Sequence, residues 1–428
     1  MFGQNDKLNL SIQLSKPKGG SAGSSTGSAE NIVDSVECSS IRGGLDLFNS
    51  YISRRLTLSH CKVLVISEEL ASKGISECIY TLLNDVEMSV QASVIISKSP
   101  AHEFLASSEP VLEDLSSKYY EIAINSNEYT GFTQNVTLIK FFSDYVDTFK
   151  EPVAILGGVN QGTFNQATSP GATSSGSVQN ANSVNSQNST QSQSQASLNS
   201  SSQNYAQNSS SGSSQSKNPS VPSGSATASF ANKDSSYTAG STPVDSKPNI
   251  ENMGLAVFKG DRLVGEMTGL ESIFHLVVSS NLKSCNISIP NPLEDSSTLD
   301  INLKLGKSTK NDVEFVNGSP LVTCKINVNI QIVSTTEKSS SGSSSYYTSE
   351  NSKLIEETCS DFLKRNILEY LYKTSKNYKS DIDGFGKYAV KYFPTMQEWN
   401  DYDWLDNYEN SIFDVEVDST LKSGYTFL

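Results

Sequence analysis

The segment KSDIDGFGKYAVKYFPTMQEWNDYDW, residues Lys379–Trp404, decides how the end of this chain folds. Two glycines, Gly384 and Gly386, bracket Phe385, and glycine lets the backbone turn sharply between two helices. Phe385 is then placed to fill the core, and Pro394 ends the second helix because proline cannot continue one. The segment has no histidine, no cysteine and no close acid–base pair. It therefore predicts a packed corner, not a catalytic site.

The bulk properties of the chain restrict the partners it can have. The sequence has 428 residues, a formal net charge of −14 and a pI near 4.8. The length predicts two or three domains. An acidic surface repels a phosphate backbone and gives no attraction to anionic lipid, so we expect no nucleic-acid partner. Because no run of 18 apolar residues occurs, no spanning helix is predicted, and any membrane attachment would be hydrophobic or covalent.

A long polar tract divides the sequence. From about residue 159 to 250 the chain consists mainly of Ser, Asn, Gln, Gly and Thr, as in NSQNSTQSQSQASLNSSSQN. Such a composition buries too little apolar surface to offset the entropy lost on ordering. Shorter polar stretches lie at 19–30 and 334–345. The sequence therefore predicts an N-terminal domain over 1–158, a disordered linker over 159–250 and a C-terminal domain over 251–428.

The first domain alternates between the periodicities of strands and helices. KVLVIS, SVIIS and EPVAILGGV are short apolar runs that predict buried strands. GGLDLFNSYISRRL, EELASKGISECIYTLLND and LIKFFSDYVDTF have apolar residues at helical spacing, with Gly74 at a predicted break. In SPAHEFLASS, Ser99 is the predicted N-cap and Pro100 the first helical residue. These elements with short connections predict an α/β-type domain.

The second domain begins with AVFKGDRLVGEM, where two strands flank the hairpin signal KGDR. A short helix in GLESIFHLVVSS is followed by four alternating strands, a long helix over 352–376 and two closing strands in FDVEVDSTLKSGYTFL. The predicted fold class is α+β: a mixed-sheet N-terminal domain and a C-terminal domain of antiparallel strands packed with a long helix, joined by a disordered polar linker.

Cysteine and histidine spacing gives no sign of a metal site. No C-x-x-C occurs, and the three histidines, His60, His102 and His275, are far apart in sequence. The cysteines stand in apolar runs such as CKVLVI, which predicts buried thiols more than disulfides or metal ligands. They are Cys38, Cys61, Cys78, Cys285, Cys324 and Cys359.

Other candidate chemistry is weak. No G-x-S-x-G nucleophile motif occurs, and the glycine pairs in LGGVNQG and SIRGGLD lack the frame of a phosphate-binding loop, so we interpret them as turns. His60, at a predicted strand start, has no partner cluster. The paired acids Glu68/Glu69 and Glu356/Glu357 are interpreted as solvated helix faces. The sequence therefore assigns no catalytic, cofactor-binding or metal-binding residue, and no cofactor.

The aromatic stretch WNDYDWLDNYENSIF has more than one interpretation. Trp399, Tyr402, Trp404 and Tyr408 could cover the core of a small domain, which is the usual role of such residues. They could instead form a protein interface, where Trp and Tyr are favoured, or a platform for carbohydrate or peptide. We favour the core.

Three motifs in this order resemble the Ger(x)C family, the GerAC-like C subunits of spore germinant receptors. They are LSHCKVLVISEELASKGI, AVFKGDRLVGEMTGLES and SDIDGFGKYAVKYFPTMQEW. In the last motif the resemblance rests on Ser380, Asp381, Gly384, Phe385, Gly386, Pro394 and Trp399. The motifs are spread over most of the chain outside the polar tract, and their joint occurrence is more specific than any one of them.

The resemblance implies a function that the residues alone do not give. It implies a non-enzymatic lipoprotein on the outer face of the spore inner membrane, beside integral-membrane A- and B-type receptor subunits, in a complex that responds to nutrients. The family's signal peptide and lipid-modified cysteine have no counterpart here: MFGQNDKLNLSIQLSKP lacks basic and apolar signal regions, and Cys38 has no lipobox. We expect the chain as given to be unanchored unless its true start lies upstream.

Two other hypotheses stay open at this stage. The chain could be a soluble or secreted ligand-binding protein without a receptor role. It could also be an enzyme with a site that has no known motif. Tight binding of a small molecule would favour the first of these, and turnover of a nutrient analogue would be needed for the second.

Overall fold

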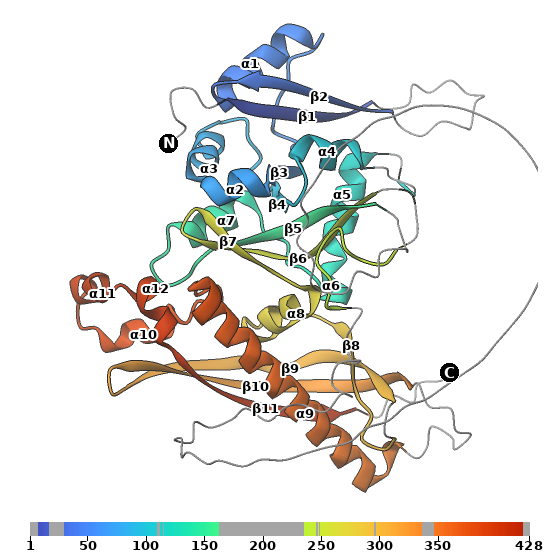
Figure 1. Ribbon diagram of the computed structural model, residues 1–428, viewed down its shortest axis with the longest axis vertical. Coiled ribbons are helices and arrows are strands. Elements are labelled where there is room, and N and C mark those ends of the chain that lie inside the picture. Colours follow the sequence, from blue (N-terminus) through green and yellow to red (C-terminus); the bar gives the residue numbers. More distant parts are fainter. Residues whose placement is uncertain are drawn as a thin grey trace, which may run out of the picture. The chain divides into compact units, whose positions relative to one another are not determined.

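The computed structural model describes residues 7–16, 30–108, 112–113, 115–161, 235–244, 247, 249–294, 297–335 and 346–422 (Figure 1). The predicted linker over 159–250 falls largely outside these residues. Both of its ends are described, however, and they contain strand residues and a short packed segment.

A five-stranded mixed sheet forms the first half of the fold, in the order β3-β4-β5-β6-β7. Neighbours among β3, β4 and β5 run parallel, whereas β6 is antiparallel to β5 and β7 is antiparallel to β6. The parallel strands are short apolar runs, as expected for strands covered on both faces. The strands are β3 Val63–Ser67, β4 Ser93–Ser97, β5 Val153–Asn160, β6 Asn249–Lys259 and β7 Arg262–Met267.

The hairpin β6–β7 belongs to this first sheet, although the sequence placed it in the C-terminal domain. Asn160 at the end of β5 is paired with Asn249 at the start of β6, directly across the polar tract. β5 is buried almost throughout, and an apolar strand of this kind needs a partner on each side. The hairpin is therefore a strand pair of the first sheet, while the division of the chain at 158 and 251 stays a prediction.

Helices cover both faces of this sheet, and their positions agree with the predicted periodicity. The predicted break at Gly74 is confirmed: α2 ends there, and the glycine has φ +118°. Ser99 is not the cap of α4, because Pro100 occupies the N-cap position and no side chain bonds the first turn. The helices are α2 Glu68–Lys73, α3 Ser76–Leu83, α4 Ala101–Ala106, α5 Ser116–Asn125, α6 Asn127–Thr130 and α7 Leu138–Tyr145.

A separate two-stranded sheet precedes these elements. β1 Leu8–Lys16 is antiparallel to β2 Glu30–Cys38, and α1 Ile41–Tyr51 follows. In β1, Leu8, Leu10, Ile12 and Leu14 alternate with polar residues, which is the pattern of a strand with one covered face. Ser40 caps α1 by accepting a hydrogen bond from the Gly43 N–H.

A four-stranded sheet in the order β11-β10-β9-β8 forms the second half. β9 and β10 are joined at Asn317 and Gly318, both with positive φ, which is the Asn-Gly turn that suits a tight hairpin. β11 pairs with β10 in parallel and not in the predicted antiparallel sense. A parallel neighbour needs a crossover, and the long helix supplies it. The strands are β8 Cys285–Pro290, β9 Thr298–Val316, β10 Ser319–Thr335 and β11 Ile412–Leu421.

The long helix α9 Ser349–Tyr372 lies against this sheet and packs most extensively on β11 (Figure 1). It continues into a π-helical turn, Lys373–Tyr378, after which come the corner segment and the short helices α10 Gly386–Ala389, α11 Met396–Tyr402 and α12 Trp404–Asn407. In the described part of the chain, none of the helices combines the length and apolar composition that crossing a bilayer requires.

We expect removal of residues 162–234, with a short Gly/Ser connector in their place, to change the free energy of unfolding by less than about 1 kcal/mol. Removal of 162–248 should cost about 1–3 kcal/mol more, because Ala239 is buried and its N–H donates to the Met253 carbonyl (2.9 Å). Urea unfolding of both variants tests this. Equal stability of the two deletions would contradict it.

Candidate functional site

The corner predicted from Lys379–Trp404 exists, and a buried carboxylate organises it. Asp381 is inaccessible to solvent and accepts hydrogen bonds from the Gly384 N–H (2.8 Å), the Gly386 N–H (2.9 Å) and Trp404 Nε1 (2.8 Å). The two glycines act differently. Gly384 has φ +74°, whereas Gly386 begins α10, where a β-carbon would meet the Phe149 carbonyl at 2.7 Å.

The aromatic residues of this region form core, as favoured from the sequence. Trp399, Trp404 and Tyr408 are at most 1 % exposed, and the two tryptophan rings stack with centroids 6.0 Å apart. Phe385 is fully buried and stacks on Tyr408. The corner is therefore held by aromatic packing around one carboxylate.

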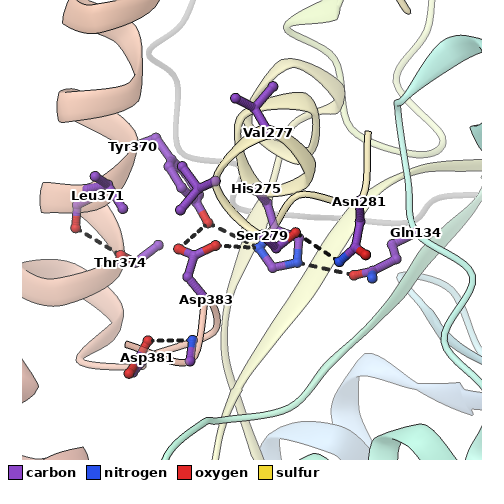
Figure 2. A network of polar contacts seen from close by, with 12 residues as sticks. Gln134, His275, Val277, Ser279, Asn281, Tyr370, Leu371, Thr374, Asp381 and Asp383 are labelled. Atoms are coloured by element: carbon purple, nitrogen blue, oxygen red, sulfur yellow. Dashed lines mark hydrogen bonds and ion pairs between the residues drawn. The ribbon is translucent and has the colours of Figure 1, made fainter. Parts of the chain in front are cut away.

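A second buried polar network lies beside the corner and was not predicted (Figure 2). His275 of α8 Gly269–Val278 places Nδ1 2.9 Å from Asp383 Oδ1 and 3.2 Å from the Tyr370 hydroxyl. Its Nε2 lies 3.1 Å from Gln134 Oε1. Figure 2 shows the imidazole pointing between Asp383 and Gln134. The segment that seemed to lack an acid–base pair thus contributes Asp383 to one, with a histidine 108 residues earlier in the chain.

Local sequence explains how these side chains are placed. α8 starts with a capping box between Thr268 and Glu271, which fixes its first turn. Most of the helix is buried, so His275 cannot reach water and must bond inside the protein. Burial, together with Asp383, raises the pKa of Tyr370 well above its ordinary value, so the hydroxyl stays protonated and donates to Asp383 Oδ2 (2.8 Å).

The network joins four segments of the chain through internal contacts. His275 has no exposed surface, and Tyr370 and Asp383 are 2 % and 4 % exposed. A substrate would have to displace this packing to reach the imidazole. The residue types are those of an acid–base site. Their geometry, however, is that of a buried hydrogen-bond network that links α8, α9, the corner and the segment at Gln134.

Glu151 is a third buried acid at the same junction. Its backbone N–H donates to the Asp381 carbonyl (2.9 Å), and its Oε2 accepts from the Gly260 N–H in the β6–β7 turn (2.7 Å). Burial raises the pKa of Glu151 to about 7 and that of Asp381 to about 6. Both carboxyls therefore hold their protons to higher pH in the folded protein than in the unfolded chain.

Stability should fall as the pH rises from about 4.5 to about 7, because over this range the folded state binds more protons at Glu151 than the unfolded state does. Glu151→Gln should make that part of the profile shallower, with the remaining slope due to the raised pKa of Asp381, and should stabilise the protein at pH 8 by about 2–3 kcal/mol relative to wild type. Urea unfolding at pH 5 and pH 8 measures this, with exposed Glu103→Gln as control. A profile unchanged by Glu151→Gln would contradict the assignment.

The predicted buried thiols are confirmed for five of the six cysteines. All six are free, and Cys61 alone among them is half-buried. Burial raises the pKa of Cys78 and Cys359 to about 11 and that of Cys285 to about 12, so these thiols are unreactive at neutral pH.

The turn interpretation of the two glycine pairs was wrong, whereas the strand predicted in EPVAILGGV and the helix predicted in GGLDLFNSYISRRL are confirmed. Gly157 and Gly158 lie inside β5, where a β-carbon on Gly158 would lie 2.6 Å from the Ala239 backbone. Gly43 and Gly44 lie in α1. These glycines allow close packing of neighbouring segments.

The candidate polar side chains lie apart from one another. His60 is exposed before β3, and Glu69 forms an exposed ion pair with Lys73 (2.7 Å), as a solvated face predicts. Glu356 differs from the prediction, since its Oε1 accepts a hydrogen bond from the Leu421 N–H at the edge of β11 (2.7 Å). Among the described residues no group of three or more His, Cys, Asp or Glu side chains has the arrangement of a metal site.

One polar hollow of about 190 Å³ lies at the carboxyl ends of β4 and β5. It is lined by Lys98, Glu103 and the turn at Gly240, among others. Ligand pockets usually enclose about 300–1,000 Å³, so this hollow is small for an organic ligand. A second hollow of about 510 Å³ lies beside α9 at the edge of β11, and its lining is almost entirely polar, with Lys353, Glu356 and Ser419 among others. Because ligand pockets are lined mainly by apolar side chains, neither hollow gives much support to the ligand-binding hypothesis.

Two family models match the chain over most of its length. The spore germination protein N-terminal domain matches residues 2–157, and the spore germination B3/GerAC-like C-terminal domain matches residues 253–424. The matches define the class: a spore germination protein built of these two parts. The chain belongs to the GerAC-like Ger(x)C family.

Individual relatives are more distant. The protein YfkR of Bacillus subtilis (strain 168), whose name assigns it to spore germination, is 25 % identical over 135 residues. That match covers 32 % of this chain and 34 % of YfkR, so the chain spans about a third of that relative's length. The crystal structure of the GerBC protein is similar with a TM-score of 0.47 and 11 % identity, over 99 % of this chain and 96 % of that one.

Proposed function

We propose that this chain is a non-enzymatic subunit of a nutrient germinant receptor that acts in spore germination. The proposal rests on membership of the GerAC-like family over both of its parts. The second support is the signature segment itself. Its two acids, Asp381 and Asp383, are buried and bonded inside the protein, so they shape the fold and leave function to the surface.

The proposed partners are integral-membrane A- and B-type receptor subunits. The proposed location is the outer face of the spore inner membrane, with attachment through a lipid-modified cysteine, as the family resemblance implies. A diacyl anchor gives stable attachment, whereas a net charge of −14 provides no attraction to anionic lipid.

Co-purification tests the partners and the location together. The chain, carrying a signal sequence and lipobox cysteine upstream of Met1, is expressed in spores with an affinity-tagged A-type subunit. We expect both the chain and the B-type subunit to elute with the tagged subunit from solubilised membrane. The cysteine-to-alanine lipobox variant should shift to the soluble fraction. If the lipidated chain never elutes with the tagged subunit from solubilised membrane, the receptor assignment is contradicted.

A further inference from the structure

The four-stranded sheet has one face turned away from α9, and in two rows across it strand pairing sets acids of β11 in line with lysines of β9. On β11 the buried side chains Phe413, Val415 and Ser419 alternate with exposed ones, so Glu416 and Asp418 lie on the outward face. Opposite-face alternation is the ordinary pattern of a half-buried strand. The unusual feature is where the charged side chains lie on this outward face.

Strand pairing places these acids in rows that end in lysines. Two neighbouring rows run across β11, β10 and β9 in this order: Glu416, Lys325, Lys310, and Asp418, Asn327, Lys307. In these two rows the acids stand on β11, at one edge of the sheet, and the lysines stand on β9, two strands along. The next row, Asp414, Thr323 and Asp312, has an acid on both strands.

Most of these charges have no partner within the described structure. Lys325 and Glu416 form an exposed ion pair (2.9 Å). In the described residues no ion pair or hydrogen bond engages the side chains of Lys307, Lys310 or Asp418. Lys310 lies directly opposite Lys325, and like charges in that position destabilise a sheet. A protein with net charge −14 thus presents two unpaired lysines side by side on β9.

We propose that two copies of this chain associate face to face through this surface, related by a two-fold axis that runs along β10. Rotation about that axis brings β11 of each copy over β9 of the other. Glu416 then faces Lys310 of the second copy, and Asp418 faces Lys307. The same rotation brings Asp414 over Asp312 of the second copy, and the charge of Asp312 is balanced by Lys391 of its own chain. A two-fold axis across the strands would instead set β11 against β11, and so acid against acid in both rows, which favours the axis along β10.

The middle strand fits the same arrangement. Asn327 and Asn329 of β10 lie on the proposed axis, each facing its own copy. An asparagine amide carries both donor and acceptor, so it can pair with a copy of itself. Lys325 also faces its copy, but its charge is balanced by Glu416 of the same chain.

The area of the face predicts a weak dimer. β11 has 10 residues, and the axis along β10 overlaps only β9, β10 and β11. At about 3.3 Å per residue and about 4.8 Å between strands each copy therefore contributes about 500 Å². The total of about 1,000 Å² is at the lower limit for specific association. We expect a dissociation constant in the micromolar range that rises at least tenfold between about 50 and 500 mM salt.

Charge-swap variants of the full chain test the proposal by sedimentation equilibrium. Variant one is Lys307→Glu with Lys310→Glu, and variant two is Glu416→Lys with Asp418→Lys. Each alone should associate at least tenfold more weakly than wild type, because like charges then face each other. An equimolar mixture of the two should associate again to within about threefold of wild type, since each reversed strand meets a complementary one.

The control is Lys73→Glu with Lys118→Glu, on α2 and α5, which has the same change in net charge as variant one and should dimerise like wild type. Thermal unfolding checks that all variants are folded. A wild-type chain that stays monomeric at 100 μM and low salt would overturn the proposal. So would a variant one that dimerises normally, or a mixture that stays monomeric.

Discussion

Replacing Asp381 with alanine should lower the free energy of unfolding by about 3–5 kcal/mol. The substitution leaves three buried donors without an acceptor: the N–H groups of Gly384 and Gly386, and Nε1 of Trp404. Each buried donor that loses its partner costs about 1–3 kcal/mol. These donors hold the corner and the aromatic core around it. The loss of stability should therefore be close to the summed cost of three unsatisfied donors, and not to the cost of a single lost hydrogen bond.

The matched controls separate this role from simple loss of a charge. Asp381→Asn retains one oxygen acceptor of nearly the same shape and should cost less than half as much as the alanine. Asp401→Ala, at an exposed site in α11, should change stability by less than about 0.5 kcal/mol. Urea unfolding followed by tryptophan fluorescence measures all three. If the alanine and asparagine variants are equally stable, Asp381 does not organise the corner through hydrogen bonds.

The second large effect should come from His275. His275→Ala removes the contacts to Asp383, Tyr370 and Gln134 and leaves a cavity in the buried helix α8. We expect a loss of about 2–4 kcal/mol, from the cavity and from a buried carboxylate that retains the Tyr370 hydroxyl as its donor.

A double-mutant cycle tests whether the two side chains act as one unit. His275→Ala, Asp383→Ala and the double variant are compared by urea unfolding. The double variant should cost at least about 1 kcal/mol less than the sum of the single variants, because either substitution already breaks the shared contact. Additive losses would show that His275 and Asp383 contribute independently. The claim that their contact links α8 to the corner would then be wrong.

Much of the fold could be predicted because its signals are local. The apolar runs of β3, β4 and β5, the period of α9 and the glycine at φ +118° that ends α2 each depend on a few neighbouring residues. The pairing of β5 with β6 could not be found in this way, since no local pattern shows which strands meet across the polar tract. The parallel sense of β11 was missed for the same reason, because it depends on the path of the whole crossover.

The buried polar network was missed because its members are distant in sequence. Asp383 and His275 are 108 residues apart, and Gln134 is a further 141 residues from the histidine. A signal did exist: His275 is the polar residue in the middle of the apolar run SIFHLVV. A histidine that periodicity places inside a core must find a partner there. The corner segment carried a similar signal. Its two acids, Asp381 and Asp383, stand among residues that are otherwise suited to a buried core.

Nutrient-triggered germination tests the central claim most directly. In spores whose sole C-type subunit gene is this one, the measurement is the loss of optical density after nutrient addition, with and without the gene. We predict that disruption slows the nutrient response at least tenfold, that the wild-type gene restores it, and that a non-nutrient trigger works equally in both strains. Spores without the gene that respond to every nutrient at the wild-type rate would contradict a role in the germinant receptor.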